Sequence, residues 1–202
     1  MQVNLVALIP ESTRKEKGGN PSQIPVDLIA EILPDAPRRK LLALREHVSA
    51  KSPAGTVRSG GLLPAYLRFQ GNMYRHIAQE VWEQRRPDVE VIIACGLRGL
   101  VASRDTVPAY AHSMAEPMPP FGKLNRWWRD NGLPEILAAY FQAVRPKTVV
   151  DLLSLEYREA VEGYADGLRG IAVKTIDFPG MGRASQPRRG EKVTEILRTG
   201  KA

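Results

Sequence analysis

An apolar run passes into a polar, glycine-rich loop at Leu8-Ile9-Pro10-Glu11-Ser12-Thr13-Arg14-Lys15-Glu16-Lys17-Gly18-Gly19. The apolar run begins at Val3, and its short, aliphatic character predicts a buried β-strand from Val3 to Ile9. A polar loop follows from Pro10 to Pro25. In α/β sheets ligands gather at the carboxyl ends of strands, so this junction is the first place to look for a site.

Three further runs share this character and predict strands at Glu90 to Cys95, Thr148 to Leu153 and Gly170 to Ile176. Near-continuous apolar strands are typical of sheets that are covered on both faces. Apolar residues also recur at helical spacing from Met73 to Trp82 and from Leu133 to Val144. We therefore expect an α/β fold, a mixed β-sheet flanked by helices, in a single domain spanning residues 1–202.

Shorter elements complete the expected pattern. Helices are predicted at 26–33 and 38–48, separated by Pro34 and Pro37, around Tyr157 to Tyr164, and after Pro187. Loops are predicted at Ser49 to Pro64 and Met114 to Gly122, where glycine or proline is frequent.

Composition limits the classes of protein. Hydrophobic residues make up 43% of the chain, which is enough for a real core. Lysine and arginine number 29 against 22 acidic residues, a surplus that favours polyanionic partners because a basic surface releases their counterions. No apolar run approaches the roughly 18 to 20 residues of a membrane span, and no signal peptide is apparent, so we expect a cytoplasmic protein without membrane contact.

Cysteine and histidine usage predicts neither a metal site nor a cofactor. Cys95 is the single cysteine, and its apolar surroundings predict a buried, inert thiol. The three histidines, His47, His76 and His112, are far apart and lack ligand spacing.

Five segments, in order along the chain, resemble the YaaA peroxide-stress protein family. They are Leu8 to Gly19, similar to LPPSEGKxxGG; Phe69 to Tyr74, similar to (F/Y)xGxxY; Cys95 to Tyr110, similar to GL(Y/F)GLLRPxDxIxxY; Trp128-Arg129, similar to an FW segment; and Val149 to Tyr157, similar to VV(N/D)LxSxxY. The resemblance implies a DNA-binding fold with a basic cleft and a role in oxidative stress. This chain departs from the pattern at Arg98, at Ala102-Ser103 and at Ala111, and its C-terminal third is shorter.

Two segments are candidates for contact with phosphate. The loop after the first strand offers Ser12 and Lys15, with glycines that let backbone amides approach an anion; the alternative is a plain basic surface loop. The segment Phe178 to Ala184 resembles the hairpin of a helix-hairpin-helix motif, although an ordinary Gly/Pro turn after a strand is favoured. Basic residues follow in a C-terminal segment, 179–202, that could be mobile: Arg183, Arg188, Arg189 and Lys192.

An aromatic pair lies between arginines at Arg126-Trp127-Trp128-Arg129. Trp128 and Arg129 could stack a base and hold its phosphate, but a tryptophan at helical spacing more often faces the core. The predicted ligand-binding set also includes Asn72, Tyr74, Arg98, Arg104, Tyr110 and Ser154.

Four residues are candidates for catalysis, namely Asp105, Asp151, Glu156 and Tyr157, because they lie near the ends of predicted strands. The favoured interpretation of Asp151 is structural, with an arginine partner such as Arg98 or Arg104. The alternative is general acid or base chemistry at a nucleobase or glycosidic bond.

Two functional hypotheses remain open. The favoured hypothesis is a nucleic-acid-binding protein of the YaaA type that is linked to oxidative-stress protection. DNA is the expected nucleic acid. The alternative is an enzyme that acts on a small nucleobase, nucleoside or nucleotide in a basic pocket. A nucleic acid or a nucleotide-like small molecule is therefore the expected partner.

Overall fold

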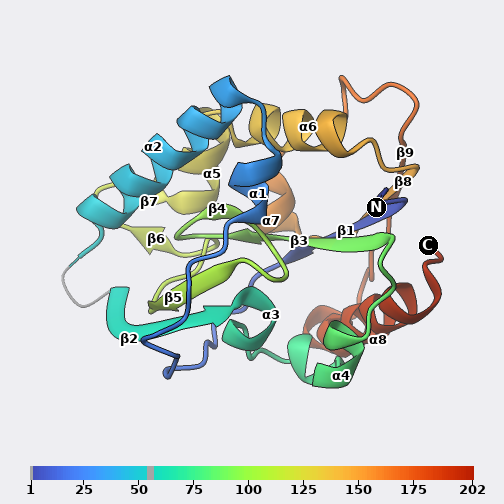
Figure 1. The fold of residues 1–202 in the computed structure, drawn as a ribbon, viewed down its shortest axis with the longest axis horizontal. Coiled ribbons are helices and arrows are strands. Elements are labelled where there is room, and N and C mark those ends of the chain that lie inside the picture. The colour runs from blue at the N-terminus through green and yellow to red at the C-terminus, as the bar shows by residue number, and fades with distance from the viewer. Residues whose placement is uncertain (1, 54–56) are drawn as a thin grey trace.

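The computed structural model describes residues 2–53 and 57–202 and shows a central sheet with helices on both sides (Figure 1). The sheet has the strand order β4-β3-β1-β8-β9. Its strands are β1 (Leu5–Pro10), β3 (Val89–Cys95), β4 (Gly99–Ala102), β8 (Thr148–Asp151) and β9 (Ala172–Thr175). The predicted mixed α/β sheet is confirmed, and each of the four predicted strands is present.

Strand β1 is the centre of the sheet. It pairs in parallel with β3 on one side and with β8 on the other, and β9 continues the parallel order beyond β8. Only β4 runs antiparallel, against β3. All six residues of β1 are buried, which explains its uninterrupted apolar sequence. The carboxyl ends of β1, β3 and β8 therefore meet at one edge.

The helices form two groups. One group contains α1 (Leu28–Ile32), α2 (Asp35–Lys51), α5 (Leu124–Asp130), α6 (Leu133–Val144) and α7 (Leu155–Ala160), in which α6 packs on α1, α2 and α5, and α5 packs on α7. The other group contains α3 (Ala65–Arg68), the 3₁₀ turns η1 (Tyr74–His76) and η2 (Gly182–Ala184), α4 (Gln79–Glu83) and α8 (Ser185–Thr199), in which α8 packs on η1, α4 and η2. In Figure 1, α2 and α6 lie above the sheet, and α3, α4 and α8 lie below it.

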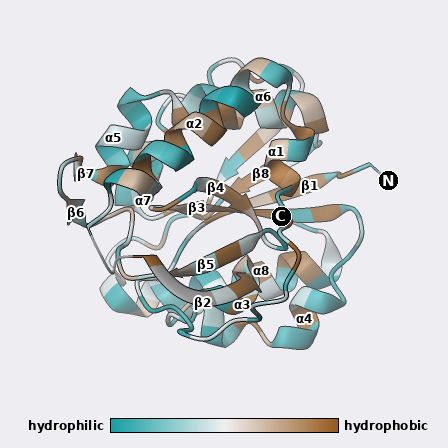
Figure 2. Cartoon of the chain, turned by 60° about the vertical axis from the view of Figure 1, so that its left-hand side comes forward, coloured by the Kyte–Doolittle hydropathy of each residue, from teal (hydrophilic) through white to brown (hydrophobic). Residues whose placement is uncertain are grey.

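Hydrophobic residues line the central strands, and hydrophilic residues cover the outer turns of the helices (Figure 2). Cys95 is fully buried, as predicted. The C-terminal helix α8 contributes Val193, Ile196 and Leu197 to the core. Among the described residues, no helix is both long and apolar enough to span a bilayer.

The predicted loop from Ser49 to Pro64 is wrong at its start, where α2 continues to Lys51, and in its second half. Strand β2 (Val57–Pro64) pairs there with β5 (Thr106–Tyr110) in an antiparallel ladder that contains an irregularity between Arg58 and Leu62. Residues 54–56 of this predicted loop lie outside the described residues. In the predicted loop from Met114 to Gly122, the short strands β6 (Pro117–Met118) and β7 (Gly122–Lys123) pair. Strand β2 depends on a partner that is distant in sequence, which local sequence does not reveal, whereas β6 and β7 are two-residue strands that pair across a short turn.

The predicted continuous helix from Met73 to Trp82 is interrupted. The chain forms η1, becomes extended at Ile77 and Ala78, and then forms α4. Helix α8 causes this break, because the Thr194 hydroxyl donates to the His76 carbonyl (3.1 Å) in place of a helical amide. Gly190 of α8 lies so close that a Cβ there would be 2.4 Å from the Met73 carbonyl oxygen.

Two prolines that were expected to precede helices lie inside their first turns. Helix α2 begins at Asp35 and includes Pro37, and α8 begins at Ser185 and includes Pro187. The amides of a first turn have no helical acceptor, so proline loses no hydrogen bond there.

Candidate functional site

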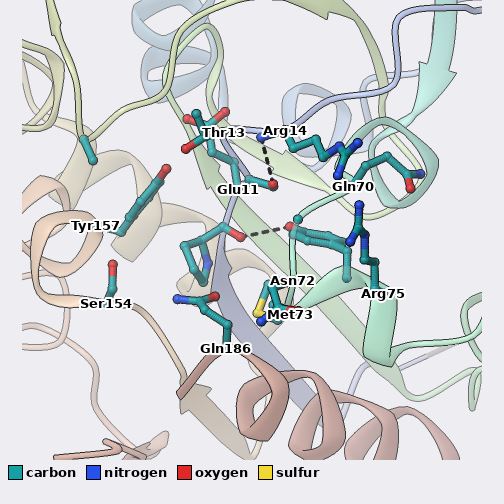
Figure 3. Close-up of a pocket in the computed structure, with 15 residues that line it drawn as sticks. Glu11, Thr13, Arg14, Gln70, Asn72, Met73, Arg75, Ser154, Tyr157 and Gln186 are labelled. Atoms are coloured by element: carbon teal, nitrogen blue, oxygen red, sulfur yellow. Dashed lines mark hydrogen bonds between the residues drawn. The ribbon is translucent and has the colours of Figure 1, made fainter. Parts of the chain in front are cut away.

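A cavity of about 470 Å³ opens where β1 and β8 end (Figure 3). We call it the β1 cavity. Its floor is formed by residues 10–12 after β1, one wall by residues 70–75, and the other wall by the start of α7 and by α8. The residues that line it are Pro10, Glu11, Ser12, Thr13, Arg14, Gln70, Gly71, Asn72, Met73, Tyr74, Arg75, Ala115, Ser154, Tyr157 and Gln186.

Glu11 is the most highly connected side chain of this region. One carboxylate oxygen accepts the backbone amides of Gly96 and Met114, each at 2.7 Å. The other accepts the Tyr110 hydroxyl and lies 3.1 Å from the Lys15 ammonium. The Glu11 side chain is fully buried, and these four partners satisfy it. Glu11 therefore fastens the end of β1 to three other segments and is not free to take part in binding.

Lys15 turns inward toward Glu11. Its ammonium also donates to the carbonyls of Ser12 and His112, each at 2.8 Å, and lies 4.1 Å from the centre of the Tyr110 ring. Only 3% of the Lys15 side chain is exposed. The structure thus places the predicted phosphate ligand Lys15 in an internal ion pair, where Glu11 balances its charge.

Two glycines allow the close contacts that shape the floor. A Cβ at Gly96 would lie 2.8 Å from the Met114 amide nitrogen, so only glycine lets the chain at residues 112–114 approach Glu11. A Cβ at Gly71 would lie 2.1 Å from the Ser12 hydroxyl oxygen. Ser12 occupies that space, and its hydroxyl accepts the Arg14 amide (3.1 Å).

Arg14 and Arg75 supply the positive charge of the β1 cavity. Both residues are exposed, and within residues 2–53 and 57–202 neither forms a salt bridge. Figure 3 shows the two side chains on the same side of the cavity, next to Gln70. Among the residues that line this cavity, Glu11 is the one carboxylate, and Lys15 already neutralises it. The cavity is therefore suited to an anion.

A second cavity, of about 550 Å³, adjoins the first. We call it the hairpin cavity, because part of its wall comes from the segment that resembles the hairpin of a helix-hairpin-helix motif. Ser154 and Gln186 line both cavities, so the two cavities are neighbours, and we refer to them together as the groove. The remaining residues of the hairpin cavity are Leu155, Glu156, Asp177, Phe178, Pro179, Gly180, Gly182, Ser185 and Arg189.

The turn at Pro179-Gly180 leads through η2 into α8, but strand β9 precedes it. The segment that resembles a helix-hairpin-helix motif thus has a helix on one side only. Arg183 is exposed in η2. Arg189 is buried and donates to the Leu152 carbonyl (3.0 Å) and the Ser185 hydroxyl (2.8 Å), which ties α8 to the end of β8.

Comparison with known proteins assigns this chain to a family. The sequence pattern described as peroxide stress protein YaaA matches residues 38–185. This chain belongs to that family. It is also similar to curated proteins named UPF0246 protein from Francisella tularensis, for example 26% identical in subspecies tularensis strain SCHU S4 and 25% identical in subspecies novicida strain U112. Each match runs over 118 residues, 56% of this chain and 44% of the relative, so the chain aligns with less than half of the length of these relatives.

Several of the predicted ligand-binding residues line the groove of this YaaA family member. Ser12, Asn72, Tyr74 and Ser154 do so directly. Tyr74 is buried and donates its hydroxyl to the Pro10 carbonyl (2.9 Å), so it supports the floor. Tyr110 lies beneath the floor and is bonded to Glu11.

Other predicted residues lie elsewhere or are already paired. Trp128 is fully buried, and its indole donates to the Gly96 carbonyl (2.8 Å), so core packing and not base stacking explains it. Arg98 pairs with Asp27 (3.1 Å), and Arg104 is exposed in the β4–β5 turn. The rest form ion pairs with neighbours: Arg129 with Asp130, Glu159 and Glu162, Arg188 with Glu191, and Lys192 with Glu195.

Of the four catalytic candidates, only Tyr157 lines the β1 cavity. Its pKa is raised, by burial first and by the Glu11 charge second. Asp105 lies in the β4–β5 turn and accepts the amides of Leu28 (2.6 Å) and Ala102 (2.8 Å). Glu156 is exposed and lines the hairpin cavity.

Asp151 is buried, accepts the Leu153 amide (2.9 Å) and pairs with Arg158 at 3.4 Å. The expected partner, Arg98 or Arg104, is therefore wrong. Arg158 follows Asp151 by seven residues on the first helix after β8, and this proximity was the signal that sequence reasoning missed. No group of three or more His, Cys, Asp or Glu side chains within the described residues is arranged to hold a metal ion.

The Glu11–Lys15 pair yields a test of stability. We expect Glu11→Gln to lower the free energy of unfolding by about 3 kcal/mol, because it leaves the Lys15 ammonium buried without a counter-charge. The double variant Glu11→Gln with Lys15→Met should lose less than the sum of the two single changes, and urea unfolding measures all four proteins. Glu16→Gln, at an exposed glutamate nearby, is the matched control. Strictly additive losses would show that the two groups are not coupled.

His112 yields a test of pH dependence. It is buried, and neither ring nitrogen has a hydrogen-bond partner among the described residues. Burial, with the Lys15 charge as a second cause, lowers the pKa of His112 to about 4. The unfolded chain therefore binds this proton first as pH falls, so the stabilising contribution is complete above about pH 6.5 and is lost toward pH 4.

We expect the stability of the natural protein to fall more steeply between pH 6.5 and pH 4 than that of His112→Leu, by on the order of 3 kcal/mol. Burial raises the pKa of Asp105 to about 6, which acts in the opposite direction between about pH 4 and 6. Both proteins contain Asp105, so its effect cancels in the difference between their unfolding curves. Parallel pH profiles would contradict the assignment to His112.

Proposed function

We propose that this chain binds nucleic acid through the groove, with DNA as the first partner and the phosphates held at Arg14 and Arg75. The observation that carries this proposal is the pair of exposed arginines at one cavity, where the one carboxylate is already neutralised. Arginine binds phosphate well because its planar guanidinium presents several donors to the oxygens at once. The net charge of +7 adds a long-range attraction for polyanions.

The site geometry favours binding over catalysis. A nucleobase-acting enzyme needs an acid or base that is free to exchange a proton with the substrate. In the β1 cavity Glu11 is fully hydrogen-bonded and buried, and burial raises the pKa of Tyr157. Asp151 is engaged with Arg158 and the Leu153 amide. In the β1 cavity the polar groups that remain available are the cations and amides typical of a binding surface, and the exposed Glu156 lies in the neighbouring hairpin cavity.

We expect the double variant Arg14→Gln/Arg75→Gln to weaken binding to duplex DNA by about tenfold or more. The slope of log affinity against log salt concentration should fall by nearly 2, because about 0.9 units are lost for each phosphate contact. Fluorescence polarisation at several salt concentrations measures both quantities.

The control is Arg39→Gln/Arg169→Gln, which removes the same charge from exposed arginines outside the groove, on α2 and before β9. If this control lowers the affinity and the slope as much as the groove variant, net charge and not the groove accounts for binding. If the natural protein fails to bind DNA at physiological salt, the proposed function is wrong.

The family name suggests the cellular role. We propose that nucleic-acid binding by this chain contributes to protection against peroxide. Cells that lack the protein should then survive hydrogen peroxide less well, and the natural protein should restore survival while Arg14→Gln/Arg75→Gln, expressed at the same level, should not. If the groove variant restores survival fully, protection against peroxide does not depend on Arg14 and Arg75.

A further inference from the structure

The size of the β1 cavity restricts what can enter it. Ligand cavities of about 300 to 1,000 Å³ hold single small molecules, and this cavity of about 470 Å³ lies within that range. The bases of an intact duplex stay stacked on the helix axis and reach such a cavity only after they leave the stack. A single unpaired nucleotide therefore fits where a base pair does not.

The two sides of the cavity differ in chemistry. Figure 3 shows Arg14 and Arg75 on one side and Tyr157 and Ser154 on the opposite side. The first side is cationic and suits a phosphate. The second presents an aromatic ring and a hydroxyl, which suit a base. This division matches the two ends of one nucleotide.

Two amide side chains, Asn72 from the wall of residues 70–75 and Gln186 from α8, also line the β1 cavity. No hydrogen bond joins the side chain of Asn72 or Gln186 to another residue in the described part of the chain. Each amide carries donors and an acceptor, the combination that pairs with base edges. Gln186 lies at the junction of the two cavities, so it can reach a base that enters from the groove.

Leu155 lines the hairpin cavity and is exposed to solvent. It is the first residue of α7, directly follows Ser154, and is 79% exposed. A single exposed leucine is common on protein surfaces, but here it lies between a cationic cavity and a hairpin. Apolar side chains in such positions pack between base steps and fill the space that a displaced base leaves.

We propose that the groove recognises an unpaired nucleotide within an otherwise paired strand, an inference that rests on the nucleic-acid-binding function proposed above. The phosphate lies at Arg14 and Arg75. The base enters the β1 cavity toward Tyr157, where Asn72 and Gln186 bond its edge. Leu155 packs against the bases that remain stacked.

The test compares three fluorescein-labelled DNA duplexes in fluorescence polarisation at physiological salt. One is fully paired, the second carries a single unpaired 2-aminopurine nucleotide, and the third carries an abasic site at that position. We expect the second to bind about tenfold more tightly than the first, because the energetic cost of unpairing is already met. The abasic duplex should lose most of that preference, and 2-aminopurine emission should rise on binding as the base leaves the stack. RNA duplexes of the same design distinguish the two polymers.

Leu155→Ala should reduce the ratio of the two affinities at least threefold. Ile24→Ala is the matched control, because Ile24 is also aliphatic, is 76% exposed and does not line the groove, and it should leave the ratio unchanged. Equal affinity of the natural protein for the paired and unpaired duplexes overturns this inference and leaves the proposed function standing. Absence of binding to all the duplexes overturns both.

Discussion

The carboxylate of Glu11 is the interaction on which the site depends. It collects the end of β1, the turn after β3, the end of β5 and the segment that follows β5, through bonds to Gly96, Tyr110 and Met114. A buried carboxylate is costly unless all its acceptor capacity is used, and here a lysine and three donors use it. Lys15 ties the loop after β1 to this charge, and Arg68 holds the same loop through the Gly18 carbonyl. The floor of the groove is thus built on an ion pair, Glu11–Lys15, whose charges balance.

The basic residues near the groove differ in what they bind. Lys15, Arg189 and the buried Arg68 bind backbone carbonyls of the protein itself, and Arg68 alone donates to the carbonyls of Val107 (3.1 Å), Gly18 (2.7 Å) and Gly61 (3.1 Å). Arg14 and Arg75 remain directed to solvent. The net positive charge of the chain is therefore an imprecise guide to binding, because part of it stabilises the fold and only part is directed to solvent.

Sequence patterns predicted the sheet well, because β1, β3 and β8 are buried on both faces and read as apolar runs. They did not predict β2 and β5, whose pairing depends on contacts distant in sequence. The loop after β1 lines the β1 cavity, but its predicted phosphate ligand Lys15 turns inward and Arg14 is the exposed cation, since polarity alone does not tell which of two neighbouring cations turns inward. Arg75 and Gln186 carried no motif, and only the packing of η1 and α8 brings them to the cavity. Asp151 was correctly expected to need an arginine, but the partner was sought far away and not in the next helix.

Helix α8 forms part of one wall of the groove and also holds the opposite wall. Its Thr194 and Gly190 hold the turn that carries Arg75, its Arg189 holds the end of β8, and its Gln186 lies between them. Because one helix braces both sides, we expect the fold itself to set the width of the opening. If the groove binds nucleic acid as proposed, the change of shape on binding should then fall mainly on the nucleic acid, and the strands that deform most easily should be preferred.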